Sequence, residues 1–453
     1  ISSIQIECTN NSVVSTMNFS NLAINHTLLT TMSLDDESNY GDSINFKKDT
    51  ASSISYQSSS SATGLGDSNV IIKPTLFDPA SGYGNTSFNQ NKGRLERMKC
   101  TSYDPLITGE SLGNLAVSGK SYCQRDSLGV LGKVVNWYGL AHIPLHILSD
   151  FFNKFPLCKG AYLRLTLNLN VNCSSVVTIA DNKFSSVVSS SQSGCVPFLL
   201  SPIDGGLNIS GTTTATKFEV SIGVARNSIN SSGSIFSHPT MSSCRIYCCL
   251  YDFTPQAEQM YLSKNSTKTI KYTDFLSFQV LNVPAGGNFS QILTNSIARG
   301  RQLIAIPQIA SSYNFAGTGK TIAPLNSPFS TSTCTTSKNA ITNYNVLVSG
   351  SNLYQQNLST TFDFYQELRK SNSINGGLSF GMSSGLINEN EFEDGYHYLV
   401  SDISRSVSEA SDNIAKSIQV IGTNSGLYPI DIFYFLQFER EVEIDISSGS
   451  LLS

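Results

Sequence analysis

The sequence predicts an all-β chain built as two tandem antiparallel β-sandwiches, and three observations carry that prediction. The first is composition: only 14% of the 453 residues are charged, whereas Ser, Thr, Asn, Tyr and Phe are abundant, and strands and turns favour these residue types. The second is a series of short alternating or apolar runs separated by turn residues. The third is an unusually long strand pattern near the end of the sequence, Ile432–Ile446.

The long pattern, IFYFLQFEREVEIDI, changes character at its middle. Its first half is apolar on both sides apart from Gln437, which is typical of a strand covered on both faces. Its second half alternates, as expected of a strand with one buried and one solvent-facing side. The solvent-facing side carries three carboxylates, Glu441, Glu443 and Asp445. At about 3.3 Å per residue the strand would span roughly 50 Å, the full height of a large sandwich.

The first half of the sequence predicts strands, a short helix and long polar loops. The strands are expected at Ile4–Cys8, Val13–Leu29, Ala161–Val171 and Lys217–Ala225. Ala141–Phe155 fits an amphipathic helix after Pro144, with its apolar side formed by Leu145, Leu148, Phe151 and Phe152.

Two polar segments, 35–90 and 172–215, are predicted to be long surface loops. Asn91–Lys99 predicts one or two helical turns, and the Ser/Asn/Gly/Pro stretch Asn227–Ser243 predicts a domain boundary. The expected domains are therefore 1–240 and 241–453.

The second half predicts a fresh set of strands with two short helices. The strands are expected at Arg245–Phe253, Thr269–Leu281, Asn288–Thr294, Arg301–Ile309, Tyr344–Ser349, Leu353–Gln356, Tyr396–Ile403, Ser417–Thr423 and Ile432–Ile446. The helices are expected at Pro255–Leu262 and at Phe362–Arg369, whose predicted apolar face is Phe362, Tyr365 and Leu368. About eight antiparallel strands in two sheets with long end loops make a jelly roll. Two eight-stranded jelly rolls in tandem, a double jelly roll, are the simplest account of this length.

Charge and cysteine usage exclude several functions. The net charge is −4 with 29 Lys and Arg, so no basic field is available to hold nucleic acid. No apolar run reaches the ~18–20 residues of a membrane span, and no signal peptide is visible. The ten cysteines include no CxxC pair, and we interpret them as reduced thiols made inside a cell, with Cys248 and Cys249 as small core residues.

No motif predicts catalysis, a cofactor or a metal. GTGKT at 317–321 ends like a phosphate loop, but Asn314 stands where the motif needs glycine and IAPLNSP follows, so a hairpin tip is favoured. His142 and His146 have a zinc-like spacing, but Pro144 lies between them and no third ligand is near. Trp137 is expected to anchor a core or an interface.

The three carboxylates of the last strand share one repeating face. Paired catalytic acids would face each other across a cleft ~5–10 Å wide. We therefore interpret this face as solvated or subunit-facing. No catalytic, cofactor-binding or metal residue is nominated.

An ordered series of segments resembles the double jelly-roll major capsid proteins of Polinton-like viruses and virophages. CRIYCCLYDFTPQAEQMYLS resembles the opening of that family's second roll, and DIFYFLQFEREVEIDISSG resembles its last strand. The segments in order are Asn91–Lys99, Ile143–Asn170, Cys244–Ser263, Thr267–Tyr272, Ala298–Pro307, Asn326–Thr331, Asn343–Gln356, Asn375–Ile387, Asp394–Arg405, Ser417–Asn424 and Asp431–Gly449. The match is dense from residue 244 onward and patchy before residue 90.

The resemblance implies a non-enzymatic shell protein. Three copies would form a pseudo-hexagonal homotrimer that tiles an icosahedral virus shell assembled inside the infected host cell. Penton and minor capsid proteins are the implied further partners, with no sequence-specific nucleic acid and no cofactor.

Two other functions remain open. A secreted or surface β-sandwich adhesin, or carbohydrate-binding protein, would explain the Ser/Thr/Asn content, and free-thiol titration would separate it from a shell protein. A β-rich hydrolase would need converging acids, and turnover of glycans would reveal it.

Overall fold

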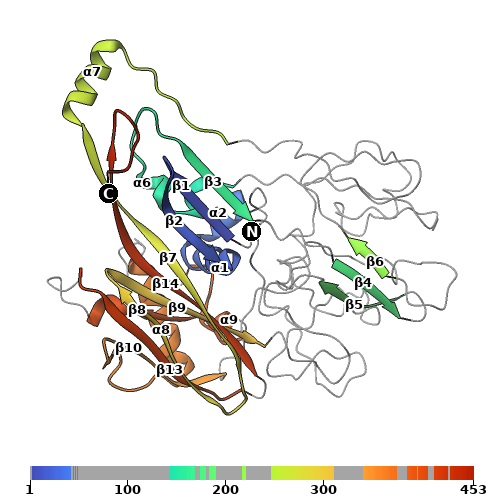
Figure 1. Cartoon of the computed structure of the whole chain (residues 1–453). Coiled ribbons are helices and arrows are strands. Elements are labelled where there is room, and N and C mark those ends of the chain that lie inside the picture. Colours follow the sequence, from blue (N-terminus) through green and yellow to red (C-terminus); the bar gives the residue numbers. More distant parts are fainter. Residues whose placement is uncertain are drawn as a thin grey trace, which may run out of the picture.

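The computed structural model describes residues 3–41, 44, 46, 48, 143–168, 174–179, 183–189, 217–220, 246–310, 340–374, 385–394, 396–406, 413–426 and 429–452 (Figure 1). This part of the chain is mostly β, with several antiparallel sheets and a few short helices. Among the helices of these ranges, none is long and apolar enough to cross a membrane.

The second half folds into an eight-stranded sandwich. Its strands are β7 (Thr267–Val283), β8 (Asn288–Ile297), β9 (Gly300–Ile309), β10 (Ile341–Val348), β11 (Ser351–Asn352), β12 (Leu399–Asp402), β13 (Lys416–Asn424) and β14 (Ile430–Asp445). One sheet has the order β12-β9-β14-β7 and the other β11-β10-β13-β8.

The pairing of these strands is that of a single long hairpin rolled up on itself. The first strand of the set pairs with the last, the second with the seventh, the third with the sixth and the fourth with the fifth, all antiparallel. This order is the jelly roll. The jelly roll predicted for the second half is therefore confirmed in these residues.

β14 is the central strand of its sheet, because it pairs with β7 on one edge and β9 on the other. Its first eight residues, Ile430–Gln437, are all buried, and alternation follows, with Val442 and Ile444 buried and Glu441 exposed. The strand predicted at Ile432–Ile446 is thus confirmed, together with its change of character.

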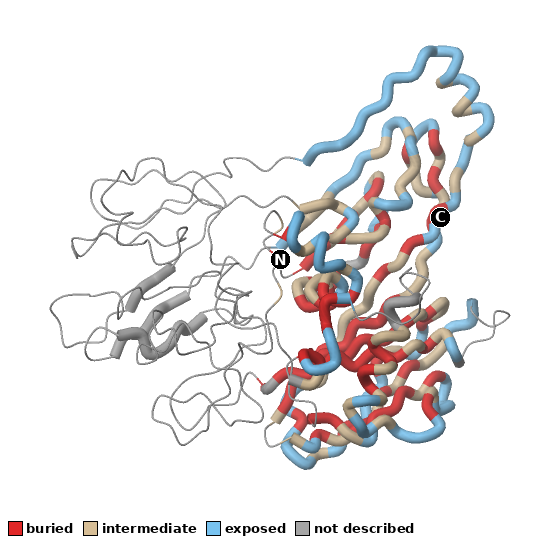
Figure 2. The backbone as a smooth tube through the Cα atoms, turned by 180° about the vertical axis from the view of Figure 1, so that it is seen from behind, coloured by how far each residue is buried: buried red, intermediate tan, exposed pale blue. Residues whose placement is uncertain are grey.

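The β7–β14 ribbon is shared by two hydrophobic cores (Figure 2). The larger core fills the space between the two sheets of the roll. The smaller core joins the far end of the ribbon to the N-terminal sheet β2-β1-β3, formed by β1 (Ser3–Cys8), β2 (Asn11–Asn18) and β3 (Leu163–Asn168). Phe151 is fully buried in this smaller core, and the centre of its ring lies 5.2 Å from the centre of the Tyr272 ring. The N-terminal strands are therefore anchored on the strands that close the roll.

Two short helices pack in the smaller core where the sequence predicts one helix. They are α5 (Leu145–Leu148) and α6 (Phe151–Lys154). The helix breaks at Ser149, whose backbone is extended, with φ −162° and ψ 140°. Leu148 and Phe151 are buried, so the predicted apolar side is correct.

The strand predicted for Val13–Leu29 is wrong in its second half. β2 ends at Asn18, Phe19 adopts a left-handed conformation, and α1 (Ser20–Thr31) follows. The buried residues of α1 recur with the period of a helix. They are Ser20, Leu22, Ala23, His26, Leu29 and Thr30.

The segments predicted to be loops also contain regular structure. α2 (Leu34–Tyr40) begins with a capping box between Ser33 and Asp36. β4 (Ser174–Ile179) and β5 (Lys183–Ser189) pair with each other, and β6 (Lys217–Val220) completes their sheet in the order β5-β4-β6. β4 and β5 each contain a Val-Val pair preceded by two serines, and β-branched residues favour strands.

The helices and hairpin of the second half differ in detail from expectation. α7 (Pro255–Lys264) is confirmed, and α9 (Glu389–Asp394) and the 3-10 turn η4 (Ile403–Ser406) are additional. α8 (Thr361–Ile374) buries Phe364, Tyr365 and Leu368, whereas Phe362 is 60% exposed, so Phe362 was placed on the wrong face. The return strand predicted at Leu353–Gln356 is instead the two-residue β11. The predictions for Asn91–Lys99 and Asn227–Ser243 lie outside the described residues.

Substituting Gly385 with alanine should lower the free energy of unfolding by about 1–3 kcal/mol, because both conformation and space favour glycine there. Its φ is +65°, and a Cβ would lie 2.3 Å from the backbone oxygen of Thr30. The next residue, Leu386, donates to the carbonyl oxygen of Leu29 at 2.8 Å, so a shift would loosen α1 from the roll. The control is Gly350→Ala, where φ is +82° but nothing lies within 4 Å. Equal losses of thermal stability in the two variants would contradict this account.

Candidate self-association surface

Within the described ranges, the chemistry-bearing residues that the sequence singled out do not converge on one site. In the described ranges, no three His, Cys, Asp or Glu residues are grouped so that they could hold a metal ion. His146 is exposed on α5, while His142, Trp137 and the GTGKT segment lie outside those ranges. The geometry therefore assigns no catalytic role to His146.

Two other histidines, His26 and His397, are buried with their rings against aromatic side chains. His26 meets the ring of Tyr398 at 5.1 Å, and His397 meets Phe364 at 5.2 Å and Phe392 at 4.8 Å. Burial lowers the pKa of each imidazole to about 3, so both are neutral at pH 7.

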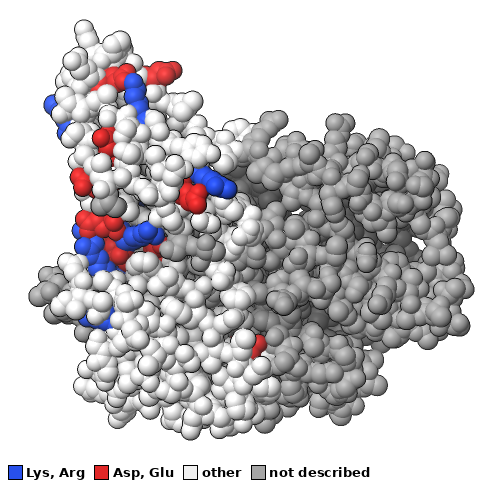
Figure 3. All heavy atoms as spheres, viewed as in Figure 1, with Lys and Arg blue, Asp and Glu red and all other residues white. Residues whose placement is uncertain are grey.

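Two carboxylates of β14, Glu439 and Glu441, are engaged within the chain. Glu441 accepts a hydrogen bond from Arg299 and lies 3.8 Å from the Lys271 ammonium, and Arg301 pairs with Glu439 at 2.9 Å. Figure 3 shows such charges gathered over this part of the ribbon on an otherwise sparsely charged face. The hydrogen bond from Arg299 lowers the pKa of Glu441. These five residues form a charged cluster across three strands, which fits a structural role better than a pair of catalytic acids.

Asp445, at the end of the same strand, holds a turn. Its carboxylate accepts from the backbone N–H of Ser447 at 2.8 Å and of Ser448 at 3.1 Å. The hydrogen bond from the Ser447 hydroxyl is the main cause that lowers the pKa of Asp445, and the backbone N–H groups of Ser448 and Ser447 lower it further. The face predicted to be solvated or subunit-facing is thus partly closed by partners from its own chain.

The most unusual exposed feature is an apolar segment before α7, residues 246–253, here named the apolar arm. The sequence predicts a strand with buried Cys248 and Cys249, but the arm has no regular structure and both thiols are exposed. Tyr247 is 77% exposed and Leu250 91%. The arm leaves the described body next to α7 (Figures 1 and 2). Both the strand and the core assignment of the cysteines are therefore wrong for the single chain.

The base of the arm is held in place by α7. The ring of Phe253 stacks on Tyr261 at 5.9 Å, and the Tyr261 hydroxyl donates to the carbonyl oxygen of Leu157 at 3.0 Å. Glu258 forms an ion pair with Lys159. The arm is therefore anchored at its C-terminal end, while its apolar side chains are exposed.

An exposed segment with apolar residues on both sides of its backbone is unusual on a protein that acts as a single chain. Only Asp252 is charged among its eight residues. Such a pattern is typical of a strand that is paired and covered on both faces. The sequence shows the pattern, but it does not show that the single chain leaves the strand uncovered.

Comparison with known proteins gives structural similarity only. No family model and no curated protein matches the sequence. Among solved structures, 44% of this chain matches 54% of the PBCV-1 protein VP54 fitted into a reconstruction of the virophage Sputnik, with 8% identity and a TM-score of 0.26. In the Sputnik virophage structure, 41% of this chain matches 38% of the other chain, with 13% identity and a TM-score of 0.24. For the Faustovirus major capsid protein, 42% of this chain matches 36% of the other chain, with 11% identity and a TM-score of 0.25.

The chain spans about half, or less, of the length of these capsid proteins. The Faustovirus structure is that of a major capsid protein.

Proposed function

We propose that this chain is a major capsid protein with a structural, non-catalytic role, which self-assembles as a pseudo-hexagonal homotrimer tiling an icosahedral shell. One observation carries the proposal. Six of the second-half segments that resemble double jelly-roll capsid proteins coincide with strands of the roll, namely β7, β9, β10 with β11, β12, β13 and β14. For example, Thr267–Tyr272 opens β7, and Asp431–Gly449 contains most of β14. The resemblance therefore covers every strand of the roll except β8.

The division of the chain follows from the same proposal. The first roll would occupy residues 1–240 and the second 241–453, with the roll of β7–β14 as the second. Penton and minor capsid proteins would be further partners in the virion, and assembly would take place inside the infected cell.

The surface of the described part also suits self-association. Closed oligomers form through repeated contact between the same patches of identical chains. The apolar arm offers such a patch, since a neighbouring copy could pair with its backbone and cover both of its faces. The low charge of the chain removes the repulsion that would oppose close packing of copies.

The size of the purified protein in solution tests the proposal. Mass photometry should give three times the 49.0 kDa mass of the chain, and negative-stain electron microscopy should show hexagonal particles or closed shells. A monomer that persists at high concentration, or turnover of a substrate by a defined pocket, would contradict it.

Replacing Tyr247 and Leu250 with serine should shift the trimer to monomer, because the variant removes two of the most exposed apolar side chains of the arm. The thermal stability of the monomer should change little, since exposed side chains contribute within about 0.5 kcal/mol. Met260→Ser on α7, also exposed at 60%, is the control. Intact trimers together with a clear fall in stability would place the arm inside the fold of its own chain.

A further inference from the structure

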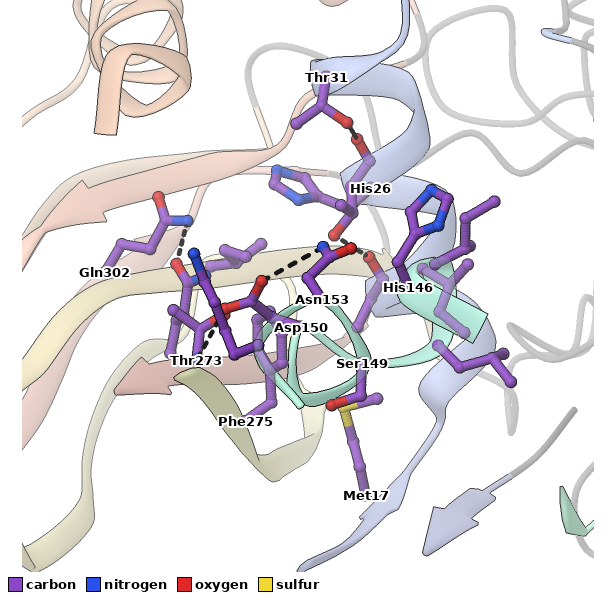
Figure 4. Close-up of a pocket in the computed structure, with 18 residues that line it drawn as sticks. Met17, His26, Thr31, His146, Ser149, Asp150, Asn153, Thr273, Phe275 and Gln302 are labelled. Atoms are coloured by element: carbon purple, nitrogen blue, oxygen red, sulfur yellow. Dashed lines mark hydrogen bonds between the residues drawn. The ribbon is translucent and has the colours of Figure 1, made fainter. Parts of the chain in front are cut away.

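A cavity of about 560 Å³ lies where the two hydrophobic cores meet (Figure 4). Its walls come from α1, from the α5–α6 segment and from strands β7, β9 and β14. Sites for small organic ligands typically measure about 300–1,000 Å³ and combine apolar walls with a few placed polar groups. The volume of this cavity falls in that range.

The apolar walls are formed by side chains from four elements and the end of β2. They are Met17, Ala23, Ile24, Leu148, Phe275 and Ile304. These side chains would cover the hydrocarbon part of a ligand.

Two glutamines form the polar floor. Gln302 of β9 and Gln437 of β14 are cross-strand partners, and they are only 2% and 6% exposed. The Gln302 amide nitrogen donates to the side-chain oxygen of Gln437, so the Gln302 oxygen Oε1 has no partner in the described part of the chain. A buried acceptor without a donor costs about 1–3 kcal/mol. A donor supplied by a ligand would remove that cost.

His26 lines the cavity from α1, across from Gln302 in Figure 4. It is 2% exposed, and neither ring nitrogen has a hydrogen-bond partner among the described residues. A neutral imidazole has one N–H donor and one acceptor nitrogen. The interior of the cavity thus offers an acceptor on Gln302 and a donor on His26.

The charged groups around the cavity do not favour an ion. Asp150 accepts from the backbone N–H of Thr273 at 3.3 Å and from the Asn153 amide at 3.4 Å, so its carboxylate is occupied in joining α6 to β7. Lys154 carries a charge opposite to that of Asp150 and is exposed, and His146 is also exposed. An ion held between Gln302 and His26, which are both uncharged at pH 7, would lose its hydration without gaining a counter-charge from either side chain.

We propose that this cavity is a binding site for a small neutral organic ligand that carries a carboxamide or an equivalent adjacent donor and acceptor. The N–H of the ligand would donate to Oε1 of Gln302, and its carbonyl oxygen would accept from His26. An aromatic or aliphatic remainder would lie against Phe275 and Ile304. The inference does not rest on the proposed shell function.

Titration of the full-length protein with three probes of similar size tests it: benzamide, benzoate and benzylamine. Benzamide should bind saturably, with a Kd on the order of 1 mM as expected of so small a molecule. The charged probes should bind at least tenfold more weakly. Nuclear Overhauser contacts between benzamide and the ring protons of His26 should place the probe in the cavity.

The double variant Gln302→Met, Gln437→Met removes the amide pair without leaving either member unpaired. It should weaken benzamide binding at least tenfold, whereas Gln279→Met, on an exposed position of β7, should not change it. Should the double variant fail to fold, His26→Phe provides a second test with the same expected loss. Equal binding of the three probes, binding unchanged by both variants, or no saturable binding of benzamide would each overturn the proposal.

Discussion

Replacing Phe435 with alanine should lower the free energy of unfolding by about 3–5 kcal/mol, the range found when large aromatic side chains are removed from protein cores. Phe435 is 0% exposed and lies in the fully buried half of β14. It is paired across the sheet with Ser277 of β7 and Ile304 of β9, so the surrounding strands have little freedom to collapse onto the space left behind. Thermal and denaturant unfolding, read by tyrosine fluorescence or circular dichroism, would measure the loss.

Phe362→Ala provides the matched control, since the same atoms are removed from a side chain that is 60% exposed. Its effect should stay within about 0.5 kcal/mol. Helical periodicity alone places Phe362 on the buried face of its helix, whereas the structure exposes it. The effect of Phe362→Ala therefore shows which of the two assignments is correct. Comparable losses in the two variants would contradict the burial assigned to each.

Most strands of the second half, though not those expected at Arg245–Phe253 and Leu353–Gln356, could be predicted because their patterns are long and their turns are marked. β14 has sixteen residues, with a doubly apolar half and an alternating half, and no helix fits both patterns. The turn at Pro284–Gly287 is closed by the N–H of Gly287 donating to the carbonyl oxygen of Pro284 at 2.9 Å. Signals of this kind are local, so they can be read without knowing the fold.

α1 was missed because its residues carry two signals at once. Thr27, Thr30 and Thr31 favour strands, but the hydroxyl of each donates to a carbonyl oxygen one turn earlier, such as Thr30 to His26 at 2.8 Å. This bonding satisfies the hydroxyl groups within a helix. The buried residues from Leu22 to Thr30 recur with the period of a helix, and their burial favours the helix. This burial depends on which side of the segment faces the core, which the sequence does not show.

The arm and the cavity depend on long-range contacts that local patterns do not contain. The run of residues 246–253 has the composition of a covered strand, but whether a partner covers it is decided elsewhere in the molecule. Gln437 stands out as the one polar residue in an apolar run, whereas Gln302 becomes its partner only through the register of β9 and β14. His26 reaches the same site from α1, although it lies more than 270 positions before Gln302 in the sequence.

Acidification should destabilise the protein through its buried histidines, and His397 gives the cleaner test because, unlike His26, it does not line the cavity. Its ring is 0% exposed, and neither nitrogen has a hydrogen-bond partner within the described residues. Burial lowers the pKa of His397 from 6.5 to about 3. Between these values the unfolded chain binds a proton that the folded chain does not. The free energy of unfolding should therefore fall by about 1.4 kcal/mol per pH unit for this residue as the pH drops from about 6.5 towards 3.

His397→Leu should remove that contribution while keeping an apolar group between Phe364 and Phe392. The variant should lose stability less steeply below pH 6.5 than the parent protein, even if the change in packing lowers its stability at pH 7. Denaturant unfolding at several pH values from 7 to 4 gives the slopes directly. Identical slopes for the parent and His397→Leu would mean that the folded protein admits the proton, and hence that the ring is accessible to water.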